Sequence, residues 1–80
     1  MARATLSFNL DKEEDVAAHK RAIKALDMCL VIWSIDQYLR GKIKYDETLS
    51  VEAYDALEKT REELLEYMNE YNVDIDELLN

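Results

Sequence analysis

The chain has 80 residues, a single cysteine, a single histidine and a net charge of −8. A core of this size is marginal, so domains this small are commonly stabilised by disulfides, a metal or a partner chain. One cysteine and one histidine exclude an internal disulfide and a closed Cys/His zinc site. We therefore expect a reduced single domain over residues 1–80 that forms a homo-oligomer, with no metal and no cofactor.

The negative charge is concentrated near the carboxyl end. Residues 51–80 contain ten acids against Lys59 and Arg61, whereas residues 1–50 are neutral overall. Acidic side chains repel phosphates, so we expect no nonspecific nucleic-acid binding. An acidic face of this kind usually contacts solvent, and the alternative is mimicry of nucleic acid toward a basic protein. The longest apolar run, residues 28–33, is far shorter than the ~20 residues that span a bilayer, so we expect no membrane association.

The first segment, residues 1–10, has over residues 4–10 the alternation typical of a strand. Leu6, Phe8 and Leu10 lie on one side, and polar residues lie on the other. A lone strand leaves its backbone groups unpaired. The segment is therefore predicted either to pair with its copy in another chain or to lie on the helices as an extended arm. In both cases Leu6 and Phe8 are candidate oligomer-interface residues.

A long helix is predicted over residues 11–40. Asp11 can cap it and Glu14 occupies the third helical position of a capping box. The first helix breaker in the sequence is Gly41. Glycine commonly terminates helices, so the helix is expected to end at residue 40. Residues 41–49 are then predicted to form a polar loop.

The remainder of the chain predicts a second helix over residues 50–71 and a capped turn over 72–80. Thr48 or Ser50 can cap the second helix, and Asn72 is suited to a left-handed stop. Asp74 can cap the final turn.

The apolar pattern predicts how the two helices pack. Helix 50–71 has one apolar and one acidic face, so it can cover one apolar stripe of helix 11–40 in an antiparallel hairpin. The predicted stripe consists of Ala18, Ala22, Leu26, Cys29 and Trp33, widened by Ile23, Leu30 and Ile32. Asp36 falls near this face, and Arg61 on the facing helix is its expected structural partner. The expected fold is mainly α.

A second apolar stripe lies on the carboxyl-terminal half of the first helix. It consists of Met28, Val31, Ile35 and Tyr38. One amphipathic helix cannot cover both stripes. We therefore predict that a second copy of the chain covers this one, as a homo-oligomer interface.

No catalytic constellation is evident, so we expect a protein that is not an enzyme. His19 and Cys29 are ten positions apart on one predicted helix, too distant to form a dyad. Cys29 is expected to pack as a small apolar side chain. Asp15 and His19 could offer two metal ligands, but a solvent-facing polar turn is the preferred interpretation.

Basic residues near the end of the first helix form a candidate ligand site. Arg40, Lys42 and Lys44 are flanked by Tyr38 and Tyr45. Cations beside aromatic faces suit a small anionic ligand such as a nucleotide. The alternative is a solubilising segment whose cations balance the acids of the second helix.

Four stretches carry a resemblance to a known group. They are Thr-Leu-Ser-Phe-Asn-Leu at 5–10, Trp33, Asp-Gln-Tyr-Leu-Arg at 36–40 and Ile-Lys-Tyr at 43–45. The chain resembles small uncharacterised proteins of tailed bacteriophages and prophages of Gram-positive bacteria. Many of these have a proline where this chain has Asp11. The resemblance covers most of the chain and implies a phage accessory protein in the host cytoplasm, but it identifies no catalytic residue.

Two functions follow as hypotheses. The first is a non-enzymatic phage accessory protein that binds a host or phage protein as a helical homo-oligomer, for example to inhibit a host process or an antiviral defence. The alternative is a small-molecule binder, such as a sponge for a nucleotide immune signal.

Overall fold

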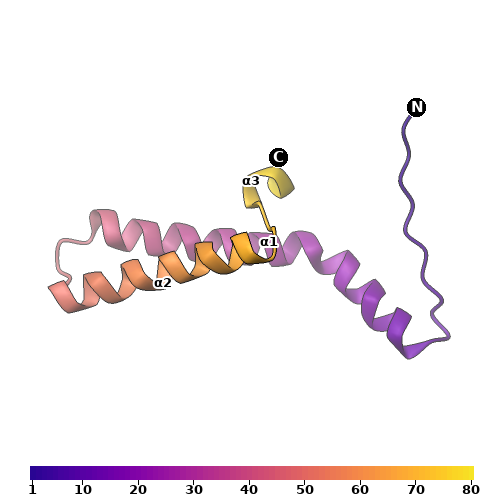
Figure 1. Ribbon diagram of the computed structural model, residues 1–80, viewed down its shortest axis with the longest axis horizontal. Coiled ribbons are helices and arrows are strands. Elements are labelled where there is room, and N and C mark those ends of the chain that lie inside the picture. The colour runs from indigo at the N-terminus through magenta and orange to yellow at the C-terminus, as the bar shows by residue number, and fades with distance from the viewer.

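The computed structural model describes residues 1–80 as an extended arm followed by three helices (Figure 1). Helix α1 spans Glu13–Tyr45, α2 spans Val51–Glu70 and α3 spans Ile75–Leu79. Helices α1 and α2 form an antiparallel hairpin, and the short α3 packs back on α1. The predicted mainly α hairpin is confirmed.

The two long helices differ in length. Helix α1 has 33 residues and α2 has 20, which correspond to about 50 Å and about 30 Å of helix. The amino-terminal part of α1 therefore extends beyond the hairpin, as Figure 1 shows. The chain is correspondingly elongated, with extents of 53 × 33 × 20 Å.

The start of α1 differs from the prediction. Lys12, not Asp11, occupies the cap position, and its side chain makes no capping hydrogen bond. Asn9 organises this turn instead: its Oδ1 accepts from the backbone N–H of Asp11, and its own N–H donates to Asp15 Oδ2 over 2.7 Å. The carboxylate in the first turn thus holds the preceding arm.

The end of α1 also differs. The prediction that Gly41 terminates the helix is wrong, because α1 continues through Gly41 to Tyr45. Gly41 has no positive φ, so it does not adopt the left-handed conformation of a helix stop. A glycine inside a helix costs only about 0.5–1 kcal/mol. The packing of Leu39, which is buried, and Ile43, which is half-buried, outweighs that cost.

Three predicted capping features are confirmed. The Ser50 side chain accepts from the Ala53 N–H at the start of α2. Asn72 has a φ of 55° and reverses the chain after α2. Asp74 accepts from the Glu77 N–H and caps α3. Because α1 ends at Tyr45 and α2 begins at Val51, the loop consists of residues 46–50 and is shorter than predicted.

Helix α2 covers only part of the predicted face of α1. The buried and half-buried side chains of the hairpin include Cys29, Ile32, Asp36, Leu39 and Ile43 on α1 and Ala53, Leu57, Arg61, Leu64 and Met68 on α2. Leu26 and Trp33 of the predicted stripe are 59% and 45% exposed. The reason is geometric: α2 is too short to reach the amino-terminal part of α1, and it follows the face that holds Asp36.

The arm is extended and forms no strand within the chain. Phe8 lies beside His19, with 5.4 Å between the ring centroids. Leu6 is exposed. Pairing of this arm with a second copy stays a prediction.

Candidate interaction surface

The second apolar stripe is not covered by the rest of the chain. Met28, Val31, Ile35 and Tyr38 are between 47% and 62% exposed. Their spacing of three, four and three residues keeps them on one face of α1, next to the face that α2 covers. A row of large apolar side chains so close to a helical seam is typical of a surface that binds another helix. We call it the apolar stripe.

An ion pair lies at each end of the apolar stripe. Lys24 pairs with Asp27 just before Met28, and Lys42 pairs with Asp46 just after Tyr38, each over 3.2 Å between Nζ and Oδ2. The surface is therefore apolar in its middle and charged at its ends. Protein–protein interfaces commonly have this arrangement, with a polar rim around an apolar centre.

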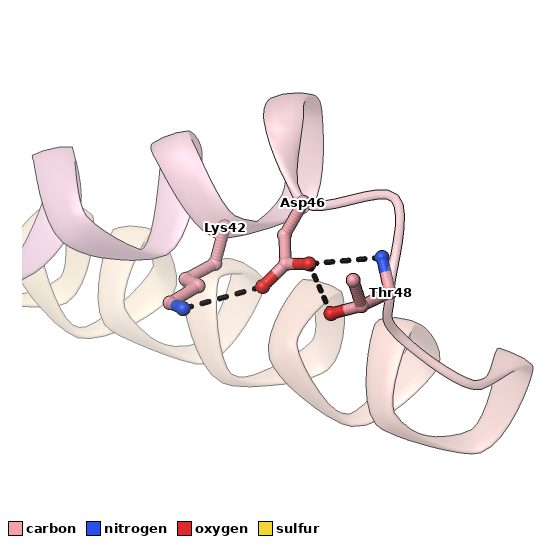
Figure 2. Close-up of polar contacts among 3 residues, drawn as sticks. All are labelled: Lys42, Asp46 and Thr48. Atoms are coloured by element: carbon pink, nitrogen blue, oxygen red, sulfur yellow. Dashed lines mark hydrogen bonds and ion pairs between the residues drawn. The ribbon is translucent and has the colours of Figure 1, made fainter.

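The ion pair after the stripe also fixes the turn into α2. Figure 2 shows Asp46 between Lys42 and Thr48. Asp46 Oδ1 accepts from the Thr48 backbone N–H over 2.9 Å and from the Thr48 hydroxyl over 2.5 Å. The Thr48 hydroxyl, the Thr48 N–H and Lys42 favour the charged carboxylate, which lowers the pKa of Asp46 to about 2.

The predicted basic site is not assembled as one cluster. The Lys42 ammonium lies 5.9 Å from the centroid of the Tyr38 ring and the Lys44 ammonium 5.4 Å from that of Tyr45. Two positions along a helix correspond to a turn of about 200°, so Arg40 and Lys42 lie on nearly opposite sides of α1. Lys42 is also engaged with Asp46. The structure thus divides the predicted cations between two surfaces.

Arg40 lines a groove between α1, α2 and α3 of about 700 Å³. Inside the groove Arg61 Nε donates to Asp36 Oδ1 over 2.9 Å, which confirms the predicted pair. The remaining charged residues lining it are Asp74, Asp76 and Glu77. Four acids against two arginines make the groove net negative, so it does not favour an anion. Sequence patterns missed this groove because it depends on where α3 lies.

His19 and Cys29 take no part in a polar cluster. Cys29 is a free, half-buried thiol, and His19 lies against Phe8. No group of three or more histidine, cysteine or acidic side chains is close enough together to hold a metal ion. None of the three helices combines the length and the apolar character needed to cross a membrane.

Comparison of the chain with protein-family models, with curated proteins and with solved structures gave no match.

Proposed function

We propose that this protein is a non-enzymatic phage accessory protein that forms a helical homo-oligomer and binds a host or phage protein in the host cytoplasm. The apolar stripe carries the part of this proposal that concerns binding. The resemblance of residues 5–10 and 36–40 to proteins of tailed phages supports the biological setting. Inhibition of a host process or of an antiviral defence fits a small protein whose main surface feature is the apolar stripe.

The shortage of buried residues supports assembly. Only Leu39 and Ile75 are buried in the single chain. Small domains without disulfides or metals need a substantial core or a partner chain. Burial of the apolar stripe against a partner supplies apolar contact that the hairpin itself lacks.

The nucleotide-sponge alternative has less support from the geometry. Lys42 is engaged with Asp46, and Arg40 faces a net-negative groove. Lys44 beside Tyr45 is the strongest remaining element, because its ammonium forms no ion pair and lies near an aromatic ring. One cation and one ring are a weak basis for holding a nucleotide.

Light scattering on the purified protein tests assembly. We expect a mass of at least twice 9.4 kDa at micromolar concentration. Val31→Glu places an unpaired charge in the apolar stripe and should dissociate the oligomer. Lys59→Glu is the control, because Lys59 is exposed on the acidic side of α2, outside the stripe. A wild-type protein that stays monomeric would overturn the proposal.

Affinity purification from infected cells tests what is bound. The oligomer should retain a protein partner in stoichiometric amount. A small anion released on heating, and lost in Lys44→Glu, would instead favour the sponge.

A further inference from the structure

The single chain exposes far more surface than a folded protein of its mass. Its accessible surface is 7140 Å², whereas monomeric proteins of 9.4 kDa expose about 5,000 Å². Its radius of gyration is 17.6 Å, against about 12 Å for a compact chain of this length. The excess surface is about 2,100 Å² per chain. Two such chains together match the 2,000–5,000 Å² that obligate homodimers bury.

The apolar stripe is complementary to itself. From Lys24 to Lys42 the residues of this face, taken with the ion pairs at its ends, follow spacings of four, three, four, three and four. This order is the same in both directions and is centred on the level of residue 33. Two copies of α1 that run antiparallel therefore bring Met28 against Tyr38 of the second copy, and Val31 against Ile35 of the second copy.

We infer that a second copy of this chain covers the apolar stripe in an antiparallel, two-fold arrangement, with α1 against α1 and the crossing near residue 33. This inference rests on the proposed function, because it specifies the homo-oligomer proposed there. A two-fold pair uses the same surface on both chains and closes on itself. It therefore buries the excess surface of both chains in one interface.

Charge favours the antiparallel over the parallel arrangement. Lys20, Arg21 and Lys24 lie on the part of α1 that extends beyond the hairpin, while α2 contains seven acids and two bases. In a parallel pair the two acidic α2 helices lie at the same end. In an antiparallel pair centred on residue 33, Lys20 and Arg21 lie beside Asp46 and the start of the acidic α2 of the second copy, while Lys24 faces Lys42.

The difference in length between α1 and α2 also favours the antiparallel arrangement. The part of α1 that α2 does not reach would remain uncovered on most sides in a parallel pair. In the antiparallel pair it lies along the hairpin of the second copy, where Ile23 and Leu26, both more than half exposed in the single chain, gain neighbours. At the ends of the contact Lys24 meets Lys42 of the second copy, and each lysine keeps its own acid, Asp27 or Asp46.

Disulfide trapping tests the arrangement. In a Cys29→Ala background, Met28→Cys and Tyr38→Cys are made as separate chains, one with a size tag, then mixed and oxidised. Both positions are partly exposed, so the single chain tolerates them. Ten helical positions separate them by ~15 Å. A disulfide requires Cα atoms within about 7 Å. The antiparallel arrangement can therefore link only position 28 to position 38, whereas the parallel arrangement can link each position only to itself.

The antiparallel arrangement predicts that the mixed 28–38 product exceeds the two self-linked products by about tenfold or more. Lys59→Cys, on the acidic side of α2, is the control and should give no rapid product. Oligomers with self-linked products at 28 or 38, or with none, overturn this inference and leave the proposed function standing. A monomer by light scattering overturns both.

Discussion

Arg61 and Asp36 form the only ion pair that joins α1 to α2, with 2.9 Å between Nε and Oδ1. The two side chains are 33% and 20% exposed, so both charges are partly removed from water. They replace what would otherwise be an apolar layer of the hairpin between Ile32 and Leu39. A charged pair at such a position fixes which residues of the two helices lie opposite each other, because any shift along the helices would leave both groups unpaired.

Removing one member of this pair should destabilise the hairpin. Asp36→Ala leaves Arg61 without its acceptor and is expected to lower the free energy of unfolding by about 1–3 kcal/mol. Replacing both, as Asp36→Leu with Arg61→Met, should restore most of that loss. Urea denaturation at one fixed protein concentration measures each variant. Lys59→Met is the control, because Lys59 is exposed on α2 and substitutions at such surface positions usually change stability by about 0.5 kcal/mol or less.

Gly41→Ala should stabilise the protein. Gly41 lies inside α1 without a positive φ, and a Cβ placed there meets no atom within 4 Å. Alanine should therefore raise the free energy of unfolding by about 0.5–1 kcal/mol. Thermal unfolding followed by circular dichroism tests this. A lower melting temperature would mean that the helix does not pass through residue 41.

Asp46 should titrate unusually low. Its pKa is lowered from 3.8 to about 2. A carboxyl whose pKa is lower in the folded state stabilises that state above its unfolded pKa. This contribution is lost as the pH falls from about 4 toward 2. Carboxyl-carbon NMR should show Thr48→Val raising the pKa of Asp46, because the hydroxyl donor is removed. Thr60→Val, whose hydroxyl bonds to Ala56 on α2, should leave it unchanged.

Asn72 should tolerate glycine better than alanine. Its φ of 55° lies in the left-handed region, which costs a residue with a Cβ about 1–2 kcal/mol. Asn72→Ala should therefore destabilise the turn that positions α3, while Asn72→Gly should not. Equal denaturation midpoints for the two variants would contradict the left-handed conformation.

The acidic face of α2 should matter little for stability. Replacing Glu58, Glu62 and Glu66 with glutamine removes like charges one turn apart, so the melting temperature should not fall. Assembly should be retained in light scattering. A folded triple variant that no longer retains its protein partner would instead identify this face as the recognition surface.

Most local signals in the sequence predicted local structure well, and the predicted Asp11 cap of α1 is the exception. The caps at Ser50 and Asp74 and the turn at Asn72 each depend on a side chain and backbone atoms a few residues away. The Asp36–Arg61 pair was also predictable, because a charge on an otherwise apolar helix face is costly unless an opposite charge pairs with it. The exposure of the apolar stripe within one chain followed from the excess of apolar positions on α1.

Non-local features were not predictable in the same way. Gly41 is an ordinary stop signal, and the burial of Leu39 and the partial burial of Ile43 favour a helix that continues through it. Which face of α1 is covered depends on the length and placement of α2, so Leu26 and Trp33 were wrongly assigned to the covered face. The separation of Arg40 from Lys42 arose because α1 extends farther than its breaker suggested.

Ile75, one of the two buried side chains, lies only five residues before the end of the 80-residue chain. Half of the buried set is thus supplied by α3, a helix of only five residues. A product that stops before Asp74 lacks α3 and leaves the Trp33 side of α1 open. Such a product should be digested by proteases faster than the 80-residue chain, so a helix of five residues controls the protease resistance of the whole hairpin.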